Sequence, residues 1–252
     1  MSISREKKIS YLINAVALLI LFGILSMLFQ SGILGSKNAY IQGICTTACY
    51  TIVLVSSLNL LTGFMGEFSL GHAGFMSVGA YASAIATSYL GTMGIPKLGL
   101  FLIALIVGGL AAAVTGVAVG IPALRLRGDY LAIVTVAFAE IIRVAFCNFQ
   151  ITGGGRTLSG ITKLSSFYWC YWVTVACVAI MYMYVRSRFG RTVTAIREDY
   201  IAAAASGINV TFYKVLTFTI SAFFAGIGGA MYAHYMTDRK STRLNSSHRC
   251  IS

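Results

Sequence analysis

Seven apolar runs constrain this chain more than any other feature, because each is long enough, or nearly so, to cross a membrane. About 20 helical residues span the ~30 Å hydrocarbon layer of a bilayer. The runs cover residues 11–29, 39–61, 70–90, 98–120, 130–149, 167–185 and 215–236. Backbone amides in lipid must pair within the protein, and the runs lack the alternating pattern of barrel strands. The sequence therefore predicts an all-α fold, a polytopic integral membrane bundle with about seven transmembrane helices.

The composition argues against a soluble fold. Charged residues make up 10% of the chain and apolar residues 58%, whereas about a quarter of a soluble domain is charged. The formal net charge of +12 comes from residues between the apolar runs, a pattern typical of membrane topology and not of nucleic-acid binding. The six cysteines form no C-x-x-C pair, so we interpret them as small buried residues and expect no disulfide framework and no metal site.

The distribution of lysine and arginine predicts the orientation of the helices. With the N-terminus inside, the cytoplasmic side collects Arg5, Lys7, Lys8, Arg125, Arg127, Arg186, Arg188, Arg191, Arg197 and Lys214. The opposite side collects Lys37, Lys97, Arg156 and Lys163. Positive charge accumulates in cytoplasmic loops, so we expect a cytoplasmic N-terminus. The run at 11–29 is too long for a signal peptide, and we interpret it as a retained span.

A glycine-rich segment with polar residues opens the third run. It reads GFMGEFSLGHAGFMSVGAYASA, from Gly63 to Ala84. We expect Ser69 to cap the following helix and Glu67 to lie near its positive end. Interrupted helices also hold polar solute groups in many transporters. A helix cap at a cytoplasmic turn and a candidate pathway site of Glu67, Ser69 and His72 both stay open.

Glu140 and Arg143 stand three residues apart within the fifth run. A charge in the bilayer is costly, so we expect the two side chains to face the protein interior and to pair. A structural ion pair and a role in gating are both compatible with this position.

Two helices carry strips of small residues at four-residue spacing. The strips are Gly108, Ala112, Gly116 and Gly120, and Ser221, Ala225, Gly229 and Ala233. Small residues let helix backbones approach closely. We expect both strips to pack against other helices, and the alternative is that they line a solute path.

The cytoplasmic gap from Arg186 to Val215 is too long for a simple turn. Its alanine-rich part predicts one helix over 192–206, ended by Gly207. Such a helix either lies on the membrane surface or forms a docking knob for a cytosolic partner.

Four motifs resemble, in order, those of the LivM-type permease subunits of branched-chain amino-acid ABC importers. They are GEFSLGHAGFMSVGAY, LRLRGDYLAIVTVAFAEIIR, TGGGRTLSGI and AIREDYIAAAASGINVTFYKVLTFTISAFFAGIGGAMYAH. The resemblance implies a subunit that moves leucine, isoleucine and valine across the bacterial inner membrane. It also implies four partners, namely a LivH-like second permease, two cytosolic ABC ATPases and a periplasmic substrate-binding protein. The chain lacks the G-x-x-x-x-G-K-S/T motif, so we expect no enzyme activity, bound nucleotide or other cofactor in it.

In that family the cytoplasmic segment looks like an ATPase-coupling loop with the pattern E-A-A-x-x-x-G. Ala202, Ala203 and Gly207 match this pattern, while Ile201 replaces the glutamate. The candidate coupling residues are therefore Arg197, Glu198, Asp199, Ala202, Ala203 and Gly207. A second departure is GRT at 155–157, where the family has a TGG-P-x-GL-x-G-I pattern.

The resemblance predicts a permease domain over 1–237 that is incomplete at its C-terminus, because family members continue with further helices. The polar segment 238–252 is expected to be a disordered tail or foreign sequence. The main alternative function is an ion-coupled secondary transporter of small amphipathic solutes, which needs its own proton or sodium site. Glu140 is the acidic residue best placed for such a site, and Arg143 is expected to neutralise it. A membrane enzyme is disfavoured because His72 and His234 are isolated in the sequence.

Overall fold

The computed structural model describes residues 20, 22–24, 26–27, 38–91, 96–124, 126, 129–148 and 167–249, with side chains described as far as Tyr235. The chain divides into two compact units, Met1–Cys45 and Thr46–Ser252. The described residues of the first unit are all helical. The predicted span 11–29 falls mostly outside the described residues, as do the motif departures at 155–157. The helix over Asn38–Asn59 begins in the first unit, and the contacts described below lie within the second unit.

Every element in the described part of the chain is a helix. They are α2 (Asn38–Asn59), η2 (Leu60–Met65), α3 (His72–Leu90), α4 (Lys97–Ala123), α5 (Asp129–Asn148), α6 (Phe167–Arg186), α7 (Arg188–Glu198), α8 (Tyr200–Ala205) and α9 (Val210–Arg249). The last six predicted spans therefore correspond to α2 with η2, α3, α4, α5, α6 and α9. The backbone of α9 stays helical to Arg249, through most of the segment that the sequence predicts to be disordered.

Among the residues that the structure describes, four helices are long and apolar enough to cross a membrane. They cover Tyr40–Met65, Lys97–Ala123, Phe167–Arg186 and Val210–Tyr235. Helix α3 is more polar, and it packs between α4, α5 and α9. A helix that is surrounded by other helices needs less apolar surface than one that faces lipid.

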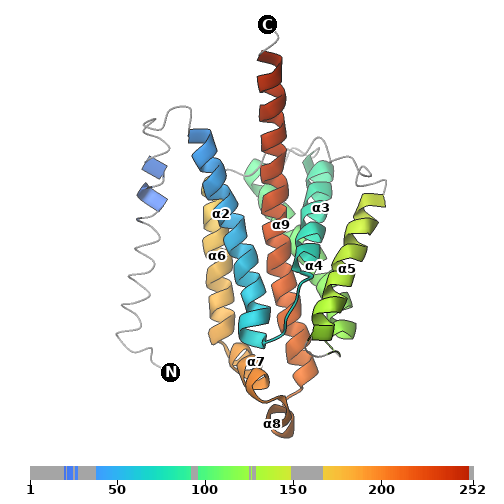
Figure 1. Ribbon diagram of the computed structural model, residues 1–252. Helices are drawn as coiled ribbons and strands as arrows, with labels where there is room; N and C mark the ends of the chain where they lie inside the picture. Colours follow the sequence, from blue (N-terminus) through green and yellow to red (C-terminus); the bar gives the residue numbers. More distant parts are fainter. Residues whose placement is uncertain are drawn as a thin grey trace. The chain divides into compact units, whose positions relative to one another are not determined.

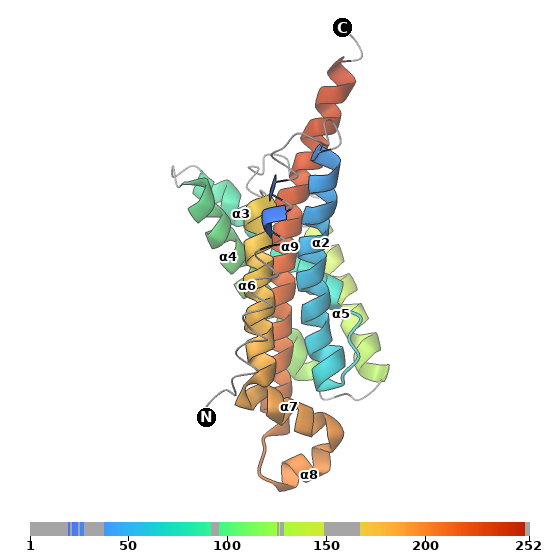
Figure 2. The ribbon, with the colours of Figure 1, turned by 90° about the vertical axis from the view of Figure 1, so that its left-hand side faces the viewer.

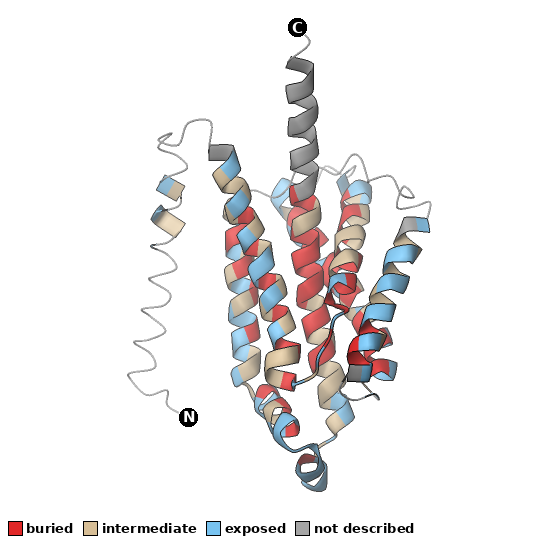
Figure 3. Ribbon diagram, in the orientation of Figure 1, coloured by how far each residue is buried: buried red, intermediate tan, exposed pale blue. Residues whose placement is uncertain are grey.

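Helix α9 packs along α3 and α4, and its middle is almost fully buried (Figures 1 and 3). A Cβ on Gly79 of α3 would lie 2.3 Å from the carbonyl oxygen of Gly226. A Cβ on Gly229 would lie 2.0 Å from the carbonyl oxygen of Met76, and one on Gly116 would lie 2.6 Å from the Cβ of Ala222. The expectation that small-residue strips pack against other helices is confirmed, since only glycine permits these separations.

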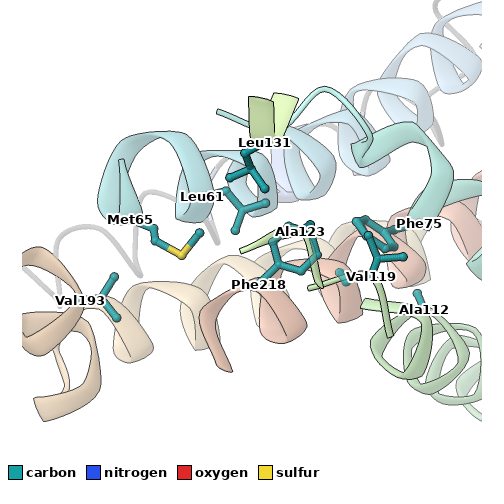
Figure 4. Packing of buried hydrophobic residues seen from close by; sticks show 11 residues of the cluster. Leu61, Met65, Phe75, Ala112, Val119, Ala123, Leu131, Val193 and Phe218 are labelled. Carbon is teal, nitrogen blue, oxygen red and sulfur yellow. The ribbon is translucent and has the colours of Figure 1, made fainter. Parts of the chain in front are cut away.

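A cluster of buried apolar residues joins η2 to five helices, α3, α4, α5, α7 and α9 (Figure 4). Phe75 of α3 meets Phe218 of α9 edge to face, with ring centroids 5.5 Å apart. The other large members are Leu61 and Met65 of η2, Val119 of α4, Leu131 of α5 and Val193 of α7. Close packing of this kind resists displacement of any one member. The cluster therefore fixes η2 and α7 against the same core.

Candidate functional site

The helical backbone is interrupted between η2 and α3. The last turn of the α2 segment is the π-helix η2, which ends at Gly66 with a left-handed φ of 75°. Residues 67–71 are not helical, and α3 begins at His72. Figure 1 shows this thin trace running from the end of η2 up to the lower end of α3. π-Helical turns are frequent at functional sites.

Contacts with α9 show how deep this non-helical segment reaches. Glu67 forms an ion pair with Lys214, near the start of α9. The hydroxyl of Ser221 on α9 donates a hydrogen bond to the carbonyl oxygen of Ser57 on α2, over 2.6 Å. The hydroxyl of Ser57 in turn contacts His72. Lys214 and Ser221 are seven residues apart on α9, and seven residues of α-helix rise about 10 Å. Helix α3 therefore starts about 10 Å further along α9 than Glu67, inside the bundle.

The start of α3 is held by a buried polar contact. Nε2 of His72 lies 2.7 Å from Oγ of Ser57, and both side chains are buried. Nδ1 of His72 has no hydrogen-bond partner among the described residues. Ser57 was missed at the sequence level, because one serine in an apolar run carries no signal of its own.

The predicted cap of α3 is wrong. Gly71 is the N-cap residue and no side chain caps the helix, while the buried Oγ of Ser69 has no hydrogen-bond partner in the described part of the chain. The segment is instead held by α5, because the amide of Leu70 donates to Oγ1 of Thr135 over 3.2 Å. Glu67 does not cap α3, and its carboxylate pairs with Lys214.

An open apolar recess lies between α2 and α3. It measures about 200 Å³ and is lined by Leu54, Val55, Leu58, His72, Ala73 and Met76. Its lining has the character that a small aliphatic side chain needs, and the first turn of α3 forms one wall.

The cytoplasmic segment forms two helices where the sequence predicted one. Asp199 has an extended backbone, with φ −149°, and ends α7. Its carboxylate accepts hydrogen bonds from the amides of Ile201, over 2.8 Å, and Ala202, over 3.0 Å. Aspartate satisfies free amides at a helix start better than it serves in a helix interior. The prediction of one helix over 192–206 is therefore wrong at Asp199.

The predicted end of this segment is confirmed. Gly207 adopts a left-handed φ of 82°, and the amide of Ile208 reaches back to the carbonyl oxygen of Ala203 over 3.2 Å. This is the Schellman arrangement, in which glycine ends a helix. Ala203 is buried, whereas Ile201 and Ala202 are exposed on α8.

Helix α7 is tied directly to the break after η2. The guanidinium of Arg197 donates to the carbonyl oxygen of Gly63, and a Cβ on Gly66 would lie 2.8 Å from Cγ of Arg197. Val193 and Ile196 of α7 are buried, while Glu198 is exposed. Figures 1 and 2 both place α7 just past the end of α6, with α8 beyond it. The coupling and break segments are thus in contact.

Glu140 and Arg143 form the predicted pair but lie apart from this region. Nε of Arg143 is 2.9 Å from Oε2 of Glu140. The side chains are 67% exposed for Arg143 and 56% for Glu140, so the expectation that they face the interior of this chain is wrong. The residues of α5 that pack inward are instead small or apolar, such as Leu131, Thr135 and Ala139.

Comparison with known proteins gives the family. The family described as the permease component of branched-chain amino acid transport systems matches residues 40–247. The chain belongs to this permease family. It is therefore a multi-pass membrane protein, and its helices form a membrane bundle.

Two bacterial relatives of this family member are the high-affinity branched-chain amino acid transport system permease proteins LivM of Salmonella typhimurium and Escherichia coli. Each is 35% identical over 225 residues, which cover 75% of this chain and 51% of the relative. A probable branched-chain amino acid transport permease protein LivM of Methanocaldococcus jannaschii is 24% identical over 194 residues, covering 73% of this chain and 54% of the relative. The chain thus spans about half the length of these relatives. No solved structure matches it.

In this permease-family chain, the structure brings together two sets of candidate residues that are distant in sequence. Arg197 of the coupling set contacts the segment that carries Glu67, Ser69 and His72. The other coupling residues lie on α7, on α8 or directly beside α8, and the Glu140 and Arg143 pair lies on α5.

Proposed function

We propose that this chain is a transmembrane permease subunit of an ABC importer for leucine, isoleucine and valine in the bacterial inner membrane. Family membership supports this assignment. The structural observation that carries it is the contact between Arg197 of α7 and the η2 break. That contact joins a protruding pair of helices to an interrupted membrane helix, which is the connection that an externally driven transporter requires.

Family membership supports the partners in this proposal. Two cytosolic ABC ATPases supply the energy, a LivH-like permease completes the membrane part, and a periplasmic protein delivers the solute. The N-terminus is cytoplasmic in this arrangement, and seven helices of this chain cross the membrane. Exposed arginines at 186, 188, 191 and 197 support the placement of α7 and α8 on the cytoplasmic side.

Helices α7 and α8 form the docking element for an ATPase subunit. Ile201 is 64% exposed and Ala202 is exposed beside it, while Asp199 and Gly207 fix the two ends of α8. ATP-driven movement of α8 is passed to α7 and from Arg197 to Gly63. The non-helical segment then shifts against α9, where the Glu67 and Lys214 pair bridges it.

The solute passes the start of α3. Branched-chain amino acids combine an aliphatic side chain with a charged head group. The recess beside Leu58 and Met76 suits the side chain, and the uncapped N-terminus of α3, beside Ser69 and His72, suits the carboxylate. The exposed Glu140 and Arg143 pair takes no part in this path.

ATP-driven uptake tests the proposal. The chain is produced with its second permease and ATPases, and leucine uptake into vesicles is measured with the binding protein present. Ile201→Asp should reduce recovery of the ATPase and leucine uptake roughly tenfold, equivalent to about 1.4 kcal/mol of docking energy. Tyr89→Asp is the matched control, because Tyr89 is 69% exposed at the opposite end of α3.

Two results would contradict the proposal. Leucine uptake that persists without the ATPases would favour an ion-coupled transporter. Equal ATPase recovery with Ile201→Asp and Tyr89→Asp would remove α8 from the docking site.

A further inference from the structure

Three exposed arginines lie where the chain leaves helix α6. Arg186 is the last residue of α6, and Arg188 and Arg191 both lie in the first turn of α7. Residues three apart on a helix share one face. We call Arg186, Arg188 and Arg191 the arginine patch. No carboxylate among the described residues forms an ion pair with Arg188 or Arg191, and the one acidic residue of α7, Glu198, lies at the other end of that helix.

The length of α6 sets the depth of the arginine patch in the membrane. Helix α6 is long and apolar enough to cross a membrane, and its 20 residues rise about 30 Å. The hydrocarbon layer has the same thickness, ~30 Å, so Arg186 lies at its boundary with the lipid head groups. Two further residues of chain reach at most about 7 Å, and the head-group region is about 5–7 Å deep. Arg188 therefore lies at the level of the head groups.

The two views of the chain agree with this depth. Figures 1 and 2 show α7 beside the end of α6, whereas α8 lies further out. The exposed residues of α8 that dock an ATPase in the proposed function, Ile201 and Ala202, are thus further from the membrane than the arginine patch. The two surfaces are separate along the axis of the bundle.

Exposed aromatic side chains adjoin the arginine patch. Phe189 is 46% exposed, and its ring centroid lies 6.0 Å from that of Tyr213 on α9. Phe212, next to Tyr213, is 55% exposed. The aliphatic side chains of Val193 and Ile196 on α7 are instead buried. Arginines combined with exposed aromatic rings are typical of a helix at the membrane interface, where the rings contact the acyl chains below the head groups.

We infer that the arginine patch binds the head groups of anionic phospholipids. A guanidinium group donates paired hydrogen bonds to a phosphate, and a cluster of arginines without carboxylates favours lipids of net negative charge. The depth of the patch brings it to the bilayer phosphates, and Phe189 and Phe212 give it an apolar border. The inference requires that α6 crosses the membrane, and it does not depend on the solute or the energy source in the proposed function.

Native mass spectrometry tests the preference for anionic lipid. The complex is purified in mild detergent with equal amounts of phosphatidylglycerol and phosphatidylcholine, and the lipids that stay bound are counted. We expect phosphatidylglycerol to be retained preferentially, and Arg191→Gln to retain roughly fivefold less of it, the effect of one charge at an anionic membrane surface. Arg191→Lys keeps the charge and should retain most of the lipid. Lys97→Gln is the matched control, because it removes the same charge at the exposed start of α4.

Three outcomes of this experiment would overturn the inference. The first is equal retention of the two lipids by the unchanged chain. The second is an equal loss of phosphatidylglycerol in Arg191→Gln and Lys97→Gln, which would make the effect one of net charge. The third is displacement of phosphatidylglycerol by inorganic phosphate at the same concentration, because the patch would then bind a free anion and not a lipid.

Photocross-linking in the membrane distinguishes lipid from a protein partner. A benzophenone amino acid replaces Phe189 on α7 and, for comparison, Ile201 on α8, which is 64% exposed. We expect a lipid adduct from position 189 and none from position 201. A cross-link from position 189 to an ATPase, to the second permease or to residues 1–37 of this chain, without a lipid adduct, would overturn the inference. Failure of position 201 to cross-link to an ATPase would count against the proposed function alone.

Discussion

At the scale of single residues, glycine sets how closely α3 and α9 approach. We expect Gly79→Ala to lower the free energy of unfolding by about 1–3 kcal/mol, the usual effect of overpacking, because its Cβ would lie 2.3 Å from the Gly226 carbonyl oxygen. Thermal unfolding in detergent measures the change. Gly91→Ala is the control, since nothing lies within 4 Å of its Cβ position. Equal melting temperatures for both variants would contradict the observed helix contact.

Gly66 and Gly207 give a second matched comparison. Both have a left-handed φ, 75° and 82°, so alanine at either position should cost about 1–2 kcal/mol of backbone strain. Only Gly66 lies against Arg197, while the Cβ position of Gly207 is open. We expect Gly66→Ala to reduce leucine uptake per ATP hydrolysed, and Gly207→Ala to retain more of it. An equal fall in leucine uptake per ATP hydrolysed in the two variants would contradict a link through Arg197.

At the break between η2 and α3, the residue types in the sequence did not predict which residues contact one another. The sequence marks Glu67, Ser69 and His72 as candidates, but the partners of Glu67 and His72 lie on α9 and α2, at Lys214 and Ser57. The capping role assigned to Ser69 assumed that the helix starts soon after it at a surface turn. The structure buries that segment, and Thr135 supplies the local contact instead. Depth within a bundle is a tertiary property that a single sequence does not carry.

At the scale of elements, Asp199 separates α7 from α8. Asp199→Ala removes both hydrogen bonds to the amides of Ile201 and Ala202, and an N-cap of this kind contributes about 1 kcal/mol. A six-residue helix has little other support. We expect faster hydrogen exchange over residues 201–206 and weaker ATPase recovery. Asp199→Asn keeps a capping oxygen and should behave like the unchanged chain, so equal exchange in all three would count against the cap.

The helices themselves were predictable, because apolar runs of about 20 residues leave few alternatives in lipid. The six predicted spans from 39 onward agree with described helices. The division at Asp199 was not recognised, because the run of alanines after it favours one continuous helix and the carboxylate acts locally against it. The orientation of α5 was also wrong. The cost of charge in lipid predicted a buried pair, and both side chains of the observed pair are exposed on this chain.

At the scale of the whole molecule, the proposed orientation gives a direct test. Cysteine at position 201 on α8 should react with a membrane-impermeant maleimide from the cytoplasmic side, because Ile201 is 64% exposed. Cysteine at position 89, where Tyr89 is 69% exposed near the end of α3, should react from the periplasmic side. Labelling of inside-out and right-side-out vesicles shows from which side of the membrane each cysteine reacts. The reverse pattern would invert the topology and place the docking helices away from the ATPases.

The packing of α3 also bears on how the chain is inserted into the membrane during synthesis. Helix α3 is not among the described helices that are long and apolar enough to cross a membrane, and the helix that it packs against most extensively, α9, is synthesised about 120 residues later. Until α9 is synthesised, the side of α3 that carries Gly79 and the uncapped start of α3 at His72 are not packed against it. Nascent chains arrested before α9 should therefore keep α3 near the translocon or its chaperones, and release should coincide with completion of α9.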